Sequence, residues 1–278
     1  MAFSNDRTFG VEIELYNVSH ERLVREMNAA GFSCSDEGYT HQTMDGWKVV
    51  TDSSIRGTGG ASGREVKGCE LVSPVLKGED GLKTLAAVFA LLNRLRARVN
   101  QTCGFHVHVG ADGLDLEGFK KLAQVYVKYE GAIDRMVKSA DRRAEGNVFC
   151  RTLRTDDIAT VLGRLENCQT IEEVASVVNP GQSRYRKLNV TAFWRHRTVE
   201  FRQKEGTMDA VDAINWVRFC VAMVNGAVTR LPGFTHRCWS MKVTATGADK
   251  WEKLFCRYIH DRRASTHFRA AIAGGVGG

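Results

Sequence analysis

The sequence has few prolines and no closely paired cysteines. Only 3 of its 278 residues are proline, so few positions forbid regular secondary structure. Its 8 cysteines are spread along the chain without a Cys-x-x-Cys pair, which argues against a structural zinc site. In a chain of this size with no evident secretion signal, we expect reduced thiols, several of them buried.

Long apolar runs are also lacking. No run approaches the roughly 20 residues that span a bilayer, and the first residues show no basic region followed by an apolar segment. We therefore expect a soluble, cytoplasmic protein with no membrane partner. The length exceeds the usual domain of about 100–150 residues, and one elaborate domain is the expectation.

Positive charge exceeds negative charge. The formal net charge is +7 at pH 7, which favours an anionic partner. Nucleotide phosphate, an acidic substrate such as an acidic peptide, and nucleic acid all fit this charge. Charge alone does not choose among them.

Three strand-like segments carry acidic, imidazole or guanidinium groups two residues apart. Side chains at i and i+2 of a strand lie on one face, and apolar residues fill the opposite face of these segments. Such groups on neighbouring strands are costly to bury unless a divalent metal or an anionic ligand compensates them. The pairs are Glu12 with Glu14, His106 with His108, and Glu200 with Arg202. The sequence therefore predicts a sheet face that binds cations.

Strands and helices are interspersed along the chain. Apolar periodicity and capping residues predict helices over 19–30, 79–99, 115–138, 209–231 and 250–262, with short helices in a polar insertion at about 141–182. Strands are predicted over 9–15, 47–51, 64–72, 102–109, 185–193 and 197–203, the last two joined by a hairpin at 194–197. Several neighbouring strands are expected to be hairpin-connected, which favours an α+β fold with an antiparallel or mixed sheet.

Glycine marks two further segments. Residues 52–63 are rich in glycine and serine and are predicted to be a loop, either covering a nucleotide or substrate or lying free on the surface. The segment lacks the P-loop arrangement of glycines, lysine and serine or threonine. The last five residues, 274–278, are expected to form a frayed tail.

The polar motifs allow more than one interpretation. His106 and His108 are a partial zinc set, and either could instead bind magnesium beside carboxylates or hydrogen-bond a phosphate. Glu200 and Arg202 fit a plain ion pair or a metal ligand beside a phosphate clamp. A basic cluster that could bind phosphate, or could be a solvated face, consists of Arg184, Arg186, Lys187 and Asn189.

Taken in order, six motifs resemble the amidoligase family, which belongs to the glutamine synthetase and glutamate-cysteine ligase superfamily. The similarity covers roughly residues 8–230, and the order of the motifs is more specific than any one of them. The motifs are Phe-Gly-Val-Glu-Ile-Glu (9–14), Asp-Ser-Ser (52–54), Glu-Leu-Val-Ser-Pro (70–74), Gly-Phe-His-Val-His-Val-Gly (104–110), Arg-Tyr-Arg-Lys-Leu-Asn (184–189) and Thr-Val-Glu-Phe-Arg-Gln-Lys-Glu-Gly-Thr (198–207).

This resemblance implies a curved, mostly antiparallel sheet of the glutamine synthetase catalytic-domain type, flanked by helices. Its concave face would bind ATP and two or more Mg²⁺ ions. The catalytic domain would span residues 1–235, followed by a helical extension and Gly-rich tail over 236–278 without a matched motif. The family pattern commonly has Asp-Gly-Ser where this chain has Asp52-Ser53-Ser54.

Site roles also follow from the resemblance. The metal ligands would be Glu12, Glu14, Glu70, His106 and Glu200. Arg202 would contact the transferred phosphoryl group, and the nucleotide or its phosphates would be bound by Arg184 and Asn189, with Lys187 and His108 as further candidates. The catalytic set would be Arg202, Glu200 and Asp52, the last as a weak candidate for the base.

The implied activity is an ATP-dependent ligation of a carboxylate to an amine through an acyl phosphate. Two other functions stay open. One is a metal-dependent hydrolase that uses His106 and His108 without ATP. The other is an anion- or nucleic-acid-binding module with a degenerate ligase site. The sequence does not identify the acid or the amine.

Overall fold

The computed structural model describes residues 6–40, 42–59, 64–139, 142, 147–229 and 261–274. Eight strands form one sheet in the order β2-β3-β4-β1-β6-β8-β7, and β5 pairs with β1 off this path. All pairs are antiparallel except β2 with β3. The strands are β1 Thr8–Leu15, β2 Cys34–Gly38, β3 Trp47–Gly59, β4 Arg64–Val72, β5 Leu76–Lys77, β6 Phe105–Gly110, β7 Leu188–Asn189 and β8 Thr198–Phe201.

Strand β1 lies at the centre of the sheet, between β4 and β6. Phe9, Val11 and Ile13 alternate along it and are buried in the core. Glu12 and Glu14 therefore point to the opposite face. The alternation that the sequence predicted for this strand is confirmed.

Four of the described helices, α1, α3, α5 and α6, begin at a residue whose side chain caps the helix. Ser19 accepts a hydrogen bond from the backbone N–H of Arg22, and Asp115 accepts one from Gly118 at 2.8 Å. Gly31 has φ +86 just after the first helix, a left-handed conformation that favours glycine. The helices are α1 His20–Ala29, α2 Gly78–Arg94, α3 Leu116–Asp134, α5 Ile158–Asn167, α6 Ile171–Val178, α7 Ala192–His196, α8 Ala210–Thr229 and α11 Arg262–Gly274, with a 3₁₀ helix at Pro180–Gln182.

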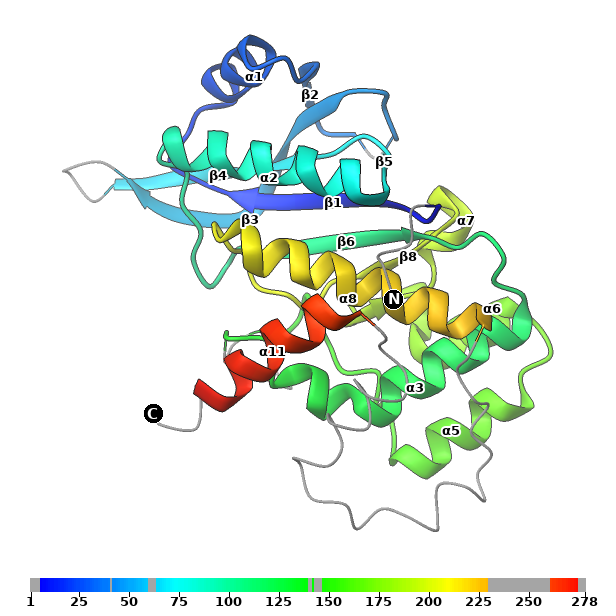
Figure 1. Cartoon of the computed structure of the whole chain (residues 1–278). Coiled ribbons are helices and arrows are strands. Elements are labelled where there is room, and N and C mark those ends of the chain that lie inside the picture. The colour runs from blue at the N-terminus through cyan, green and yellow to red at the C-terminus, as the bar shows by residue number, and fades with distance from the viewer. Residues whose placement is uncertain are drawn as a thin grey trace.

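Helices cover the apolar face of the sheet. Figure 1 shows α2 and α8 in front of the strands, with α3 beside α8. Phe89 of α2 packs edge-on against Phe105 of β6 with ring centroids 6.1 Å apart, and Tyr126 of α3 contacts Phe201 of β8. The core thus lies between these helices and the sheet, and the polar face of β1, β6 and β8 points away from it.

Helix α8 is long and apolar enough to cross a membrane, and 72% of its apolar window is buried inside the molecule. This burial identifies it as a core helix of the fold. The helix corrects the expectation that no apolar segment approaches membrane length. The polar residues Asp212, Asn215 and Arg218 interrupt the run, and all three are buried.

Two sequence expectations about local structure are wrong. Residues 52–63 are not simply a loop, because β3 continues to Gly59 and pairs with β4 beyond an irregularity between Thr51 and Arg56. The strand expected over 185–193 is only Leu188–Asn189, and the residues after it form helix α7 instead of a hairpin turn. Phe193 of α7 packs against Phe119 of α3, a contact that local sequence does not reveal.

Other expectations hold in part. The short helices expected in the insertion are α5 and α6, and the six described cysteines are free and buried. The helix expected over 79–99 ends at Arg94. Most of the helix expected over 250–262 and the last four residues of the tail lie outside the described residues, as does the predicted domain boundary at 235.

Candidate metal and substrate site

Strand register brings polar side chains from five strands into one row. Glu14 lies opposite Glu70, Glu12 opposite His106, and His108 opposite Glu200. On the last strand, Asn189 lies opposite Glu200. Directly opposed residues on antiparallel strands have neighbouring side chains, so the row is continuous from β4 to β7.

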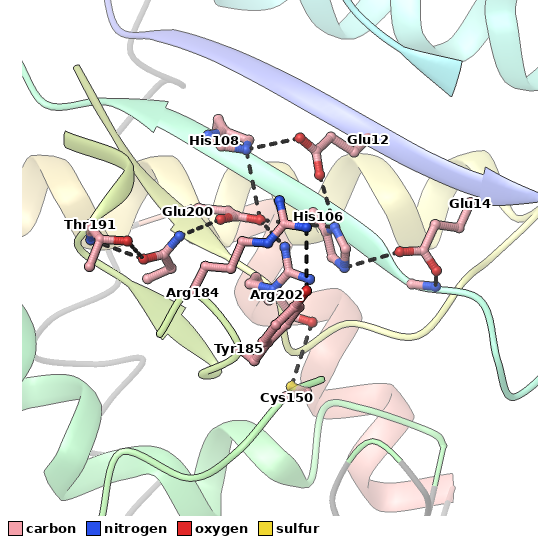
Figure 2. Close-up of polar contacts among 12 residues, drawn as sticks. Glu12, Glu14, His106, His108, Cys150, Arg184, Tyr185, Thr191, Glu200 and Arg202 are labelled. Atoms are coloured by element: carbon pink, nitrogen blue, oxygen red, sulfur yellow. Dashed lines mark hydrogen bonds and ion pairs between the residues drawn. The ribbon is translucent and has the colours of Figure 1, made fainter. Parts of the chain in front are cut away.

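Glu12 is the centre of this row. Its Oε2 lies 3.0 Å from His106 Nδ1, and its Oε1 lies 3.2 Å from His108 Nε2 (Figure 2). One carboxylate therefore contacts both imidazoles of the His-x-His motif.

Two groups of side chains have a geometry that could hold a metal ion. Glu12, Glu70 and His106 each offer a ligand atom, and these atoms lie within 4.8 Å of one another. Glu12, His108 and Glu200 form a second such group. Below, we call these the Glu70 triad and the Glu200 triad. Both contain Glu12, and their carboxylate and imidazole donors suit divalent cations.

The charges of the Glu70 triad are unbalanced. Burial, together with the carboxylates of Glu12 and Glu14, raises the pKa of Glu70 well above its ordinary value. Burial opposes ionisation of Glu12 as well, but hydrogen bonds with His106 and His108 hold the pKa of Glu12 well below its usual range. In addition, His106 Nε2 is buried without a hydrogen-bond partner among the described residues. A bound divalent cation would satisfy both the unpartnered nitrogen and the repelling carboxylates.

Glu200 in the second triad is held from two sides. Its Oε2 accepts a hydrogen bond from Asn189 Nδ2 at 2.7 Å, and its Oε1 accepts one from Arg202. Burial would raise the pKa of Glu200, but the positive charges of Arg202 and His108 lower it. This carboxylate is therefore ionised and fixed in orientation. The Nε of Arg202 is buried without a partner among the described residues and is available to an anion.

Glu14 lies at the edge of the Glu70 triad. Its Oε2 accepts a hydrogen bond from the backbone N–H of Gly104 at 2.6 Å and lies 3.7 Å from Arg142 Nη2. A Cβ atom at position 104 would come within 2.3 Å of Arg142 Nη2 and 2.7 Å of His106 Nε2. A larger residue at this position would displace the Arg142 guanidinium or the His106 ring, so glycine permits their close approach to the backbone.

Glu12 lines three cavities. The Asp52 cavity, of about 370 Å³, is lined by Asp52, Glu70, Arg142, Arg184, Tyr185 and Arg202, among others. The Trp194 cavity, of about 530 Å³, is lined by Asn189, Trp194, Arg195, His196 and Glu200, among others. The Lys48 cavity, of about 210 Å³, includes Lys48, Ser73 and Thr198. Ligands on different sides of one metal cluster could therefore bind together.

The structure brings most of the sequence-predicted site residues together. Asp52 accepts a hydrogen bond from the backbone of Ser54 at 2.7 Å and lines its cavity, and Arg184 lines both that cavity and the Trp194 cavity. The residues in the row or lining its cavities are Glu12, Glu14, Asp52, Glu70, His106, His108, Arg184, Asn189, Glu200 and Arg202.

Lys187 corrects one expectation. Its ammonium group is buried and bonded to Glu130 at 3.0 Å and to Asp134 at 2.7 Å, both on helix α3. It lines none of the three cavities at Glu12. The basic residues of the segment 184–189 therefore have different roles. Arg184 lines the site, whereas Lys187 joins the segment to α3.

Sequence reasoning missed four residues at the site. Tyr185 lies between Arg184 and Arg186, and Lys48 lies between the apolar residues Trp47 and Val49 on a predicted strand, so a signal existed for both. His196, whose ring lies edge-on to His108 at 5.6 Å, fell in the supposed hairpin turn. Arg142 lies in the polar insertion, where nothing in the sequence marks it.

The family model described as "Putative amidoligase enzyme" matches residues 5–224. Among solved structures, a bifunctional glutathione synthetase from Pasteurella multocida is 14% identical, with a TM-score of 0.43 over 97% of this chain and 47% of that chain. A novel glutamine synthase homolog is 12% identical, with a TM-score of 0.47 over 98% of this chain and 67% of that chain.

This chain thus spans about half the length of the glutathione synthetase. Among curated proteins, none matches. The two structural likenesses are distant, and the assignment depends on the family match, which covers most of the chain and all the motifs of the row. The chain belongs to the family of putative amidoligase enzymes.

Proposed function

We propose that this protein is an ATP-dependent ligase that joins a carboxylate to an amine through an acyl-phosphate intermediate. The observation that carries the proposal is the pair of triads that share Glu12 on one sheet face. Divalent cations bound to ATP would best compensate the negative charge of the carboxylates on this face.

Residues of this chain would bind the metal ions and the phosphates of ATP. The Glu70 triad, with Glu14 at its edge, and the Glu200 triad would each hold a magnesium ion. Bound magnesium would neutralise charge on the phosphate oxygens. Arg202 would stabilise the transferred phosphoryl group, because it is buried and its Nε has no partner among the described residues. Arg184, which lines the cavities on both sides, would bind a further phosphate oxygen.

The proposed reaction has two steps. A carboxylate oxygen of the acid attacks the γ-phosphorus of ATP, and the bond to ADP breaks. The amine nitrogen then attacks the acyl carbon, and phosphate leaves as the amide forms. The amine must lose a proton, and Asp52, which lines its cavity, would accept it.

The test is a screen for ADP release with purified protein, ATP and mixtures of carboxylates and amines, with and without Mg²⁺. We expect Mg²⁺-dependent ADP release together with a condensed product found by mass spectrometry. Glu12→Ala should abolish both, because it removes a ligand from each triad. Glu21→Ala, an exposed glutamate on α1, is the matched control and should keep wild-type turnover. Full ligation by Glu12→Ala would refute the role of the triads.

The metal content of the purified protein distinguishes the hydrolase hypothesis from the ligase proposal. A hydrolase built on His106 and His108 would be purified with stoichiometric zinc and would act without ATP. The nucleic-acid hypothesis is disfavoured by the four glutamates of the row, whose charge would repel a phosphodiester chain.

A further inference from the structure

Exposed aromatic side chains border the Asp52 cavity. Tyr39, Phe149 and Tyr185 all line it, and Phe149 and Tyr185 are 45% and 37% exposed. Elsewhere on the described surface, large exposed apolar side chains such as Val211 and Val228 belong to helix α8. Apolar surface gathered at a cavity mouth is typical of a binding site for another molecule.

These aromatic rings connect the surface to the reacting centre. Phe149 and Tyr185 pack edge to face with centroids 5.9 Å apart. The guanidinium of Arg184 lies 5.2 Å and that of Arg202 5.7 Å from the centroid of Tyr185. Figure 2 shows Tyr185 beside these two arginines, next to Glu200. We call Phe149, Tyr185 and Arg184 the aromatic shelf.

Arg184 is short of negative partners. Its recorded hydrogen bond goes to the hydroxyl of Tyr185 at 3.5 Å, a neutral group, and no carboxylate pairs with it among the described residues. The surface that leads into the cavity therefore combines exposed rings with the positive charge of Arg184.

We propose that the acid substrate of the ligase is an acidic side chain or terminus of a polypeptide, and that the aromatic shelf binds the peptide around it. This inference rests on the proposed function. A free amino acid would be enclosed by the cavity and would leave the shelf exposed to water. An acidic peptide covers the rings with its backbone and apolar groups, and its further carboxylates pair with Arg184.

A single-stranded nucleic acid would also stack on exposed rings beside arginines. It carries no carboxylate to be activated, and the glutamates of the acidic row would repel its phosphates. The chemistry of the cavity therefore favours the peptide.

The experiment measures binding to the full chain without ATP, so that its outcome does not depend on ligation. The probe is a short, fluorescently labelled peptide that is rich in glutamate and contains one aromatic residue. Its binding is measured by fluorescence anisotropy. We expect Phe149→Ala and Arg184→Gln each to weaken binding about tenfold, as truncation of a contributing interface residue does. Val211→Ala, an exposed apolar residue on α8, is the control and should bind as wild type does.

Three outcomes would overturn the inference: equal affinity for the peptide with glutamine in place of glutamate, equal affinity in Phe149→Ala, or stronger binding of a short oligothymidylate. A different result would refute the ligase proposal, namely that no acid and amine tested causes release of ADP. If ligation occurs with free amino acids and is unaffected by Phe149→Ala, the ligase stands and the peptide inference falls.

Discussion

Asn189 donates its side-chain amide to Oε2 of Glu200 at 2.7 Å and leaves Oε1 facing Arg202 and the two histidines. The Oδ1 of Asn189 in turn accepts hydrogen bonds from the backbone and hydroxyl of Thr191. A partner that orients a metal ligand in this way normally affects metal affinity strongly.

Asn189→Ala is therefore expected to weaken Mn²⁺ binding by about 10–100-fold in the absence of nucleotide. Isothermal titration calorimetry of the purified variant measures this. Asn167→Ala, an exposed asparagine at the end of α5, serves as the control. Unchanged Mn²⁺ affinity with weakened ATP binding would mean that Asn189 contacts only the nucleotide.

Glu70→Gln should change the pH dependence of stability in metal-free protein. Because the pKa of Glu70 is raised in the folded state by burial and by Glu12 and Glu14, folding favours its protonated form. This group's contribution to stability is complete at low pH and is lost as pH rises through the raised pKa. We expect the variant to melt at a higher temperature than wild type at neutral pH and to lose that advantage in acid. Identical melting curves across the pH range would contradict the charge repulsion described for the triad.

Lys187→Met tests the corrected role of Lys187. Removing the ammonium leaves the buried Glu130 and the partly buried Asp134 without their cation, which should cost about 3–5 kcal/mol in the free energy of unfolding. Urea unfolding measures this cost. Lys83→Met, which breaks an exposed pair with Asp80, is the control and should leave the free energy of unfolding close to that of the wild type. If Lys187→Met instead kept wild-type stability and lost nucleotide affinity, the original expectation for Lys187 would be restored.

Asp52→Asn probes the proposed proton acceptor. Loss of a general base typically lowers kcat by about 10²–10⁴-fold, whereas the uncharged amide keeps the shape and the hydrogen bond from Ser54. Steady-state kinetics with the acid and amine found by the screen would show the change, with metal affinity unaltered. Asp156→Asn, on the exposed surface before α5, is the control. A kcat within about twofold of wild type would exclude Asp52 as the acceptor.

The sheet face could be predicted from the sequence because strand alternation fixes side-chain direction. Glu12, His106 and Glu200 each stand in an alternating apolar strand, and the structure places all three side by side. The α+β class and the mostly antiparallel sheet are likewise confirmed.

Glycine misled the prediction for residues 52–63. A Cβ at Gly57 would lie 2.2 Å from the ring of Tyr16, and one at Gly68 would lie 2.1 Å from Ile55. Gly57 therefore lets Tyr16 pack against β3, and Gly68 lets β4 pack closely against Ile55 of β3, whereas the sequence suggested a loop.

Tertiary contacts decided the remaining differences. Residues 190–196 contain valine, phenylalanine and tryptophan, which favour strands locally. In the structure, residues 192–196 form helix α7, and its Phe193 packs against Phe119 of α3. Arg142 reaches Glu14 from an insertion with no pattern of its own, so only coordinates could place it.

Glu12 gives the two triads a common member, and so the occupancy of one is thermodynamically linked to that of the other. Under the proposed function, a first cation would draw on the same carboxylate charge that a second would use, so loading either triad would alter the affinity of the other by a reciprocal factor. We would then expect a form with one cation to differ in affinity and in reactivity from a form with two.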